Sequence, residues 1–245
     1  MREDKQAIRE HIWRLMEEKG VARFPLPVRG RIPNFQGAGE AAERLAATPE
    51  WRRARVVKVN PDSPQKPVRL LALTQGKILV MASPRIREGF VLLEPDRIPR
   101  RLYRHASTIR GAMRLGRRLT LRELSRLSID LMVTGSVAVD RSGGRLGKGE
   151  GYAELEYAIL RTLGAITEET PVATTVHDLQ IVDHVPREPY DLTVDIIATP
   201  KRLIRVKPRP PKPKGIIWEL LPAEKLAEIP LLRELKRMIM GDGRR

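Results

Sequence analysis

The chain has 245 residues, of which 41% are hydrophobic and 4% aromatic, and its formal net charge is +16 at pH 7. This length predicts one α/β domain, or one domain with a small appendage, and a core filled by Leu, Ile, Val and Ala. The absence of cysteine excludes disulfides, thiolate metal sites and cysteine nucleophiles. The sequence shows no signal peptide and no apolar run near about 18 residues, so we expect a cytoplasmic protein without membrane contact.

The basic charge predicts an anionic partner, either a nucleic acid or a polyanionic small molecule such as a nucleotide. Lys and Arg are spread over the whole chain, so an Arg-rich solvated surface is the alternative explanation for most of them. The high charged content of 31%, the 20 prolines and the missing cysteines are also typical of a thermophilic source. The net charge is therefore compatible with RNA as a partner, but it can also be explained without one.

The N-terminal half is predicted to begin with a helix and continue with short strands. Apolar residues at helical spacing indicate an amphipathic helix over residues 3–19, on which Lys5 and Arg9 share one face. These two cations could grip one anion together, or they could form a solvated basic flank. A second helix is predicted over residues 37–47. Strands are predicted over residues 55–59, 70–73, 78–81 and 90–93.

The loop that follows the first of these strands, residues 60–64, contains Asp62 and Ser63. Loops at the carboxyl ends of parallel strands form the ligand crevice of open α/β sheets, so both residues are candidates for it; a plain turn is the alternative. Later strands are predicted over residues 129–139, 171–175, 179–182 and 192–198. Alternation with helices predicts an α/β fold: a three-layer α/β/α arrangement with a mostly parallel open sheet.

Residues 140–152, DRSGGRLGKGEGY, are the most informative segment of the chain. Five glycines alternate with Arg145 and Lys148, between a predicted strand and a predicted helix over residues 152–163. Such a loop can turn several backbone N–H groups toward one anion, and the helix N-terminus adds its partial positive charge. A solvated hairpin loop is the alternative. The glycine spacing fits neither the Walker loop nor the dinucleotide fingerprint, which disfavours a P-loop NTPase or a simple NAD enzyme.

The C-terminal part begins with a proline-rich basic segment, KPRPPKPK, over residues 207–214. Its prolines predict an extended, stiff chain, which we expect to act as a surface-hugging linker; contact with an anionic partner is the alternative. An apolar stretch at residues 216–221 and a helix around residues 231–240 follow. We therefore divide the chain into an α/β domain, residues 1–207, and a linker with a helical tail, residues 208–245, that packs on the same domain.

The glycine loop and its flanks resemble the 5-formyltetrahydrofolate cyclo-ligase family, also called methenyltetrahydrofolate synthetases. The family loop reads D-x-x-G-x-R-L-G-x-G-x-G-Y-Y-D. The residues that fit it in order are Asp140, Gly143 or Gly144, Arg145, Leu146, Gly147, Gly149, Gly151 and Tyr152. The downstream segment VPREPYD, residues 185–191, is similar to the family's V-P-x-E-x-H-D, and Lys5 and Arg9 match its K-x-x-x-R.

Three positions depart from the family pattern: Ala153 replaces a Tyr, Glu154 an Asp, and Tyr190 a His. The central segments are similar to a divergent branch, which includes proteins fused to an RNA-recognition domain. Nothing in these residues reads as the aromatic motifs of such a domain.

The resemblance implies a Rossmann-like, NagB/RpiA/CoA-transferase-like sheet and an ATP- and Mg²⁺-dependent ligase. The family converts 5-formyltetrahydrofolate to 5,10-methenyltetrahydrofolate and releases ADP and phosphate. In that reaction the formyl oxygen is phosphorylated, N10 attacks the formyl carbon and phosphate departs. This chemistry needs charge neutralisation and positioning more than a protein nucleophile.

The resemblance also assigns roles by position. Arg145 and Lys148 would act in catalysis by holding phosphates, and Glu154 and Asp191 would hold Mg²⁺. The implied nucleotide-binding residues are Lys5, Arg9, Gly144, Arg145, Gly147, Lys148, Gly149, Gly151 and Tyr152. A reduced folate and a nucleotide are the expected ligands of a monomer. The alternative is a cyclo-ligase-like protein that binds a nucleotide or RNA and has lost turnover.

Overall fold

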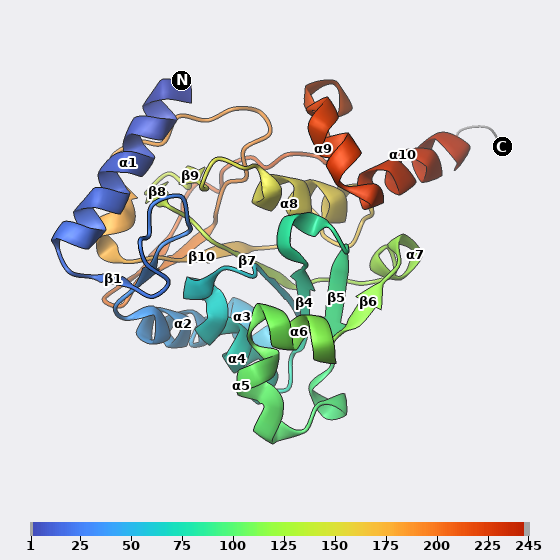
Figure 1. Cartoon of the computed structure of the whole chain (residues 1–245), viewed down its shortest axis with the longest axis horizontal. Helices are drawn as coiled ribbons and strands as arrows, with labels where there is room; N and C mark the ends of the chain where they lie inside the picture. The colour runs from blue at the N-terminus through green and yellow to red at the C-terminus, as the bar shows by residue number, and fades with distance from the viewer. Residues whose placement is uncertain (1, 243–245) are drawn as a thin grey trace.

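The computed structural model describes residues 2–242, and its centre is an eight-stranded sheet with helices on both faces (Figure 1). The strand order is β13-β12-β10-β7-β3-β4-β5-β6. The five strands from β12 to β4 are parallel, and antiparallel strands close both margins. These strands are β3 (Val56–Val59), β4 (Ile78–Ala82), β5 (Phe90–Leu93), β6 (Arg117–Leu119), β7 (Leu131–Thr134), β10 (Val172–Thr175), β12 (Ile196–Ala198) and β13 (Leu203–Arg205). The predicted α/β fold with a mostly parallel sheet is confirmed.

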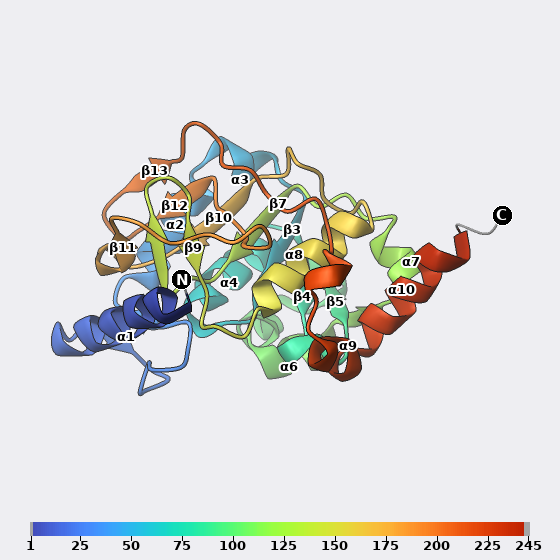
Figure 2. The ribbon, with the colours of Figure 1, turned by 90° about the horizontal axis from the view of Figure 1, so that it is seen from above.

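The two faces of the sheet carry separate layers of helices, as the two perpendicular views show (Figures 1 and 2). Alternate strand residues point to opposite faces, so Leu79 and Met81 pack into one core and Val80 and Ala82 into the other. The first core is covered by α2 (Ala38–Ala46), α4 (Lys66–Thr74), α5 (Tyr103–Ala106) and α6 (Ile109–Leu115). The second is covered by α7 (Leu121–Leu124), α8 (Tyr152–Thr162) and α10 (Pro230–Asp242).

A second, three-stranded sheet carries the glycine loop away from the central sheet. Its order is β11 (Ile181–Val182), β8 (Ala138–Asp140) and β9 (Arg145–Leu146). Helix α1 (Arg2–Glu18) packs against it, because Ile12, Trp13 and Met16 share a buried cluster with Val137, Ala138 and Leu146. The polar face of α1 therefore lies beside the glycine loop.

Two predicted strands differ from the structure. Residues 70–73 lie in α4, because a four-residue apolar run does not distinguish a strand from a buried helix, and Val68 and Ala72 bury one helical face. Residues 129–139 form two strands, β7 and β8, in different sheets. The chain turns at Gly135, where an added Cβ would lie 2.8 Å from the Ile32 side chain.

Two further strand predictions are correct only in part, since residues 179–182 contain only the short β11 and residues 192–198 only β12.

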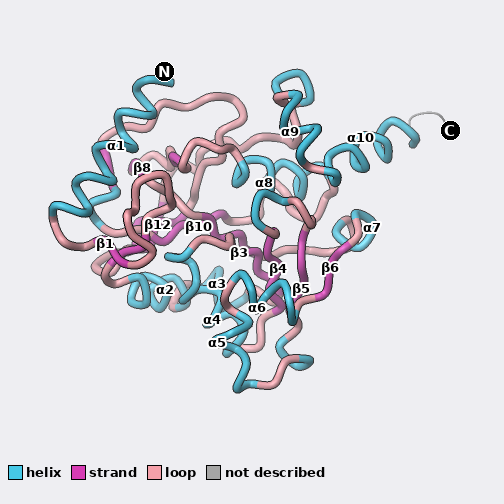
Figure 3. The backbone as a smooth tube through the Cα atoms, in the orientation of Figure 1, coloured by secondary structure: helices cyan, strands magenta, loops and turns pink. Residues whose placement is uncertain are grey.

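The remaining short elements and the C-terminal part complete the fold. The short elements are β1 (Ala22–Arg23), β2 (Asn34–Phe35), α3 (Pro49–Arg53) and the 3₁₀ helices Ser63–Gln65, Pro84–Ile86, Pro95–Arg97, Arg100–Leu102, Asp178–Gln180 and Trp218–Leu220. After β13 the chain runs largely as a loop to α9 (Ala223–Glu228) and α10 (Figure 3). Within residues 2–242 no helix is long and apolar enough to cross a lipid bilayer.

Candidate functional site

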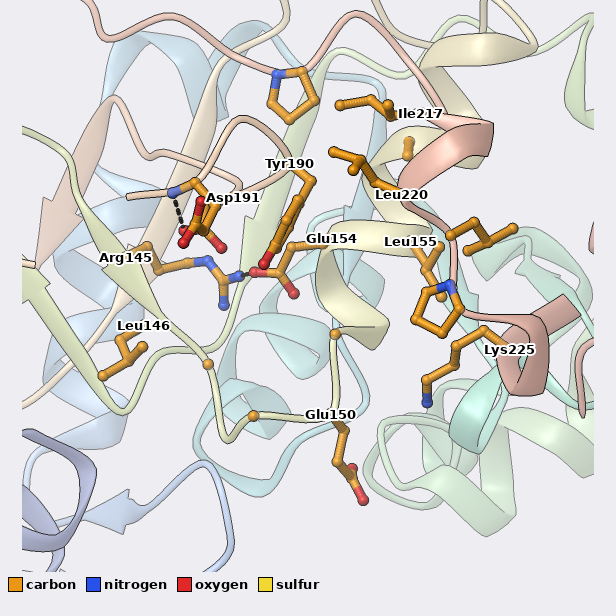
Figure 4. A pocket seen from close by; sticks show the side chains of 18 of the residues that line it. Arg145, Leu146, Glu150, Glu154, Leu155, Tyr190, Asp191, Ile217, Leu220 and Lys225 are labelled. Carbon is orange, nitrogen blue, oxygen red and sulfur yellow. Dashed lines mark hydrogen bonds and ion pairs between the residues drawn. The ribbon is translucent and has the colours of Figure 1, made fainter. Parts of the chain in front are cut away.

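A cavity of about 780 Å³ lies between α1, the glycine loop, the start of α8 and the C-terminal segment, residues 213–225 (Figure 4). One end is polar, where Arg145, Glu154 and Asp191 lie close together; the other end is apolar, where Leu155 faces Leu220. The predicted site residues that line it are Lys5, Arg9, Arg145, Gly147, Gly149, Gly151, Glu154 and Asp191. The fold thus gathers residues from both ends of the chain around one loop.

Arg145 is fixed at the base of the polar end. Its side chain has no exposed surface; it donates from Nη1 to the Gly135 carbonyl at 2.9 Å and from Nε to the Leu192 carbonyl at 3.2 Å, and it pairs with Glu154. Burial lowers the pKa of the guanidinium from 12.5 to about 10, against the opposing charge of Asp191. The group therefore stays cationic at neutral pH and supplies a fixed positive charge under the loop.

Two cations of α1 reach the same end. Lys5 Nζ lies 2.5 Å from Asp191 Oδ2, and Arg9 Nε donates to the Gly147 carbonyl at 2.7 Å. Burial lowers the pKa of the Arg9 guanidinium, and the nearby Asp191 opposes that shift. Gly149 has φ +101°, and an added Cβ there would lie 3.3 Å from the Arg9 guanidinium carbon. Glycine at this position lets Arg9 approach the backbone of the loop.

The loop presents unused backbone donors beside these cations. The N–H groups of residues 147–151 donate to no acceptor in the part of the chain that the structure describes, and Gly151, at φ +74°, begins α8 without a side-chain cap. Uncapped N–H groups at a helix N-terminus bind anions, and phosphate oxygens are suitable acceptors. The arrangement is a candidate anion site.

The structure places three other predicted nucleotide-binding residues outside the lining of this cavity. Gly144 N donates to Asp140 Oδ1 at 2.9 Å, inside the turn that forms the loop. Lys148 Nζ lies 2.8 Å from a Glu150 oxygen and faces a smaller cavity on the other side of the loop. The Tyr152 hydroxyl donates to Glu228 at 2.9 Å, which turns its ring toward α9.

The two predicted magnesium ligands share the polar end of the cavity but have basic partners. Glu154 pairs with Arg145, and Asp191 Oδ2 accepts from Lys5 and, at 2.6 Å, from the Glu188 N–H. No group of three or more His, Asp and Glu side chains that could hold a metal occurs among residues 2–242. Two carboxylates beside an anion site still fit Mg²⁺, which commonly takes one or two carboxylates together with phosphate oxygens and water.

Buried charges around the smaller cavity, of about 210 Å³, were not predicted. Lys58, in the middle of β3, is fully buried and pairs with Glu156 of α8 and with Asn60. Burial lowers the pKa of Lys58 and raises that of Glu156, each against the charge of the other. A lysine inside the apolar run VVKV was the available signal, because a charge in a buried strand needs a partner.

Asp62 and Ser63 separate in the structure. Asp62 lines the smaller cavity, and burial raises the pKa of its carboxyl, against the charges of Lys148 and Arg69. Ser63 begins a 3₁₀ helix and lies outside both linings. The residues of the C-terminal segment that line the large cavity were also missed, because their place depends on long-range packing.

The fold and the site define an α/β protein with a mostly parallel central sheet and a candidate anion site on its glycine loop. The chain belongs to the 5-formyltetrahydrofolate cyclo-ligase family, whose profile matches residues 1–200. This confirms the resemblance found in the glycine loop.

Several known proteins are similar to this chain. It is 44% identical over 237 residues to the methenyltetrahydrofolate synthase domain-containing protein of Bos taurus, which covers 95% of this chain and 62% of that protein. The Mus musculus protein of the same name is 45% identical over 237 residues, with 95% and 63% covered. The chain therefore spans less than two thirds of the length of these relatives.

A solved structure, the 5,10-methenyltetrahydrofolate synthetase of Aquifex aeolicus, shares the fold. It is 19% identical to this chain, with a TM-score of 0.50, and the match covers 83% of this chain and 93% of that one.

Proposed function

We propose that this chain binds ATP and Mg²⁺ and converts 5-formyltetrahydrofolate to 5,10-methenyltetrahydrofolate, releasing ADP and phosphate. The observation that carries the proposal is the glycine loop, where the N–H groups of residues 147–151 are without acceptors among the described residues and lie beside Lys5 and Arg9. Donors fixed in this way stabilise phosphate oxygens without reorganising.

In this proposal the basic residues around the loop bind the phosphates and the acidic residues bind the metal ion. Lys5 and Arg9 hold the phosphates from α1, and Arg145 keeps a positive charge beneath them. Glu154 and Asp191 are the residues that would hold Mg²⁺, which neutralises phosphate charge when bound. Phosphoryl transfer depends on such neutralisation and positioning, so no protein nucleophile is needed.

The smaller cavity is the proposed place for the reacting part of the folate. The two cavities share a wall made by five residues, Arg145, Gly147, Glu150, Gly151 and Glu154. A formyl group entering from the side of Asp62 would meet the terminal phosphate at this wall. Lys148 lines the smaller cavity and would neutralise charge from that side.

A second candidate function is nucleotide or RNA binding without turnover. The closed ion pairs Arg145–Glu154 and Lys5–Asp191, the net charge of +16 and the changed positions Ala153 and Tyr190 favour it. Mg²⁺ would have to compete with Arg145 and Lys5 for the two carboxylates, whereas a nucleotide or RNA phosphate on the loop N–H groups would not.

The first experiment follows the absorbance of the methenyl product from 5-formyltetrahydrofolate, with and without Mg-ATP. We expect ATP-dependent product, and we expect Arg9→Ala to lower its rate by about ten- to a hundredfold, since a charged hydrogen bond contributes about 1.5–3 kcal/mol. Arg14→Ala is the matched control, because Arg14 lies on the same helix with 67% of its side chain exposed and, among the described residues, pairs only with Glu18. Absence of product together with measurable ATP binding would support the second function.

A further inference from the structure

The apolar end of the large cavity is built by residues beyond the family match, which ends at residue 200. Ile216, Ile217, Leu220 and Leu221 come from the C-terminal segment and line this end. Leu155 and Ala158, on one face of α8, line it from the opposite side. The result is a slot with largely aliphatic walls that opens toward the glycine loop; Tyr190 and Lys225 also line the cavity (Figure 4).

The C-terminal segment is anchored on both sides of the slot. Just before it, Lys212 Nζ lies 2.7 Å from Asp195 Oδ1, and near its start the Ile216 N–H donates to Thr162 Oγ1 at 3.0 Å. After it, Leu232 of α10 is fully buried in the core beneath α8. The wall is therefore held in place by the fold itself, although it consists largely of loop (Figure 3).

Part of the apolar surface of the slot is exposed and is not covered by other side chains of the described chain. Leu220 is 53% exposed at its rim, although neighbouring apolar side chains of the same segment are partly covered. Leu155 and Glu154 line the same cavity from the first turn of α8, so the apolar wall lies close to the proposed Mg²⁺ ligand. A ligand with an anionic end on the loop would place its other end between these walls.

We propose that the C-terminal segment forms the base-binding wall of the nucleotide site, with the heterocyclic ring packed between Leu155 and Ala158 on one side and Ile217 and Leu220 on the other. The inference rests on the proposed function, because it requires the phosphates on the glycine loop. Aliphatic walls bind by the apolar area that they cover rather than by hydrogen bonds. ATP and GTP should therefore bind alike, and both more tightly than CTP, which has a smaller ring.

Trp218 provides a signal inside the chain itself. It belongs to the 3₁₀ helix Trp218–Leu220 of the wall, and the Lys236 ammonium lies 5.7 Å from its ring centre. The two other tryptophans, Trp13 and Trp51, are buried in other clusters. Nucleotide binding should change the emission of Trp218, and Trp218→Phe should remove that change.

The test compares ATP with inorganic tripolyphosphate by calorimetry, on the full chain and with Mg²⁺. We expect ATP to bind about tenfold or more tightly than tripolyphosphate, as the burial of one ring implies. The double variant Ile217→Ala, Leu220→Ala should lose that advantage and keep its affinity for tripolyphosphate. Met240→Ala is the control, because Met240 is a 64% exposed apolar residue of the same C-terminal part, away from the slot.

The possible outcomes separate the two proposals. Unchanged ATP affinity in the double variant would place the ring elsewhere and overturn the inference, while the phosphate site would stand. Equal loss of ATP and tripolyphosphate would mean that the segment only supports the loop, and would also overturn it. Failure of the wild-type chain to bind either ligand would overturn the proposed function, and the inference with it.

Discussion

Lys58 shows how a single residue links the core to the site. Lys58 is fully buried in β3. Its partner Glu156 lies in α8, the helix that follows the glycine loop. A buried pair of this kind is costly to form, yet removal of one partner leaves an uncompensated charge in the interior. The pair therefore fixes α8, and the proposed phosphate site at its start, against the central sheet.

We expect Lys58→Met to lower the free energy of unfolding by about 3–5 kcal/mol, because Glu156 would be left buried and unpaired. The double variant Lys58→Met, Glu156→Leu should regain much of that loss, since both charges are then gone. Urea unfolding measures both values. A double variant no more stable than the single one would show that the pair itself, and not the orphaned charge, carries the stability.

The sequence could predict which residues line the cavity only where their positions depend on spacing within one short segment. Arg145, Gly147 and Gly149 line the cavity as their motif indicates. Tyr152 belongs to the same motif but turns to Glu228, and Lys225 lies 3.6 Å from its ring centre. No local pattern shows that contact, because the partners are far apart in the sequence and meet only after the C-terminal helices pack.

At the scale of elements, Asp140 determines the shape of the glycine loop. Its carboxylate accepts hydrogen bonds from the N–H groups of Ser142, Gly144 and Val185 at 2.8–2.9 Å. Burial raises its pKa, but the hydrogen bonds from Ser142, Val185 and Gly144 outweigh burial and hold the pKa below its ordinary value of 3.8. A single side chain thus ties β8, the loop and the segment before Asp191 together.

The depressed pKa sets the direction of a pH effect. Because the folded state favours the ionised carboxyl, its stabilisation is fully present above the ordinary pKa of 3.8 and is lost as the pH falls through the lower folded value. Asp140→Asn should therefore lower the free energy of unfolding by about 1–3 kcal/mol at pH 7. The difference from wild type should shrink below pH 3.8, as urea unfolding at several pH values would measure. A difference independent of pH would contradict this origin.

Helices and strands were predictable where a single apolar periodicity, helical or strand-like, extends over the whole segment. Strands β3, β4, β5 and β10 and helices α1, α2 and α8 follow their apolar patterns. The segment 129–139 contains two strands in different sheets, and at Gly135 between them an added Cβ would lie 2.8 Å from the side chain of Ile32, which comes from a distant part of the chain. Tertiary packing overrides the local apolar run at that point.

At the scale of the whole molecule, the C-terminal part completes a cavity that the family-matched part leaves open on its apolar side. The division into a domain of residues 1–207 and a tail of residues 208–245 stays a prediction. The contacts Lys212–Asp195 and Tyr152–Glu228 nevertheless tie the two parts together. A ligand in the cavity would contact both, so binding should stabilise the tail as well as the loop.

The chain has 46 basic and 30 acidic residues, and this excess of positive charge is the reason to test RNA as an alternative ligand. Binding through the phosphate backbone releases counterions, so we expect the affinity for a single-stranded RNA to fall by about tenfold or more between 50 and 200 mM salt. ATP binding in the partly enclosed cavity should change much less, because buried charges are screened less.

The salt dependence of the two affinities can be compared directly. Fluorescence anisotropy of a labelled RNA and calorimetry of ATP binding are measured over the same salt series. If Arg9→Ala weakens ATP but leaves RNA unchanged, the RNA lies on the basic surface outside the cavity. Loss of both ligands in that variant would instead place RNA phosphates on the glycine loop. RNA binding that does not respond to salt would contradict a backbone contact and leave the charge as a general property of the surface.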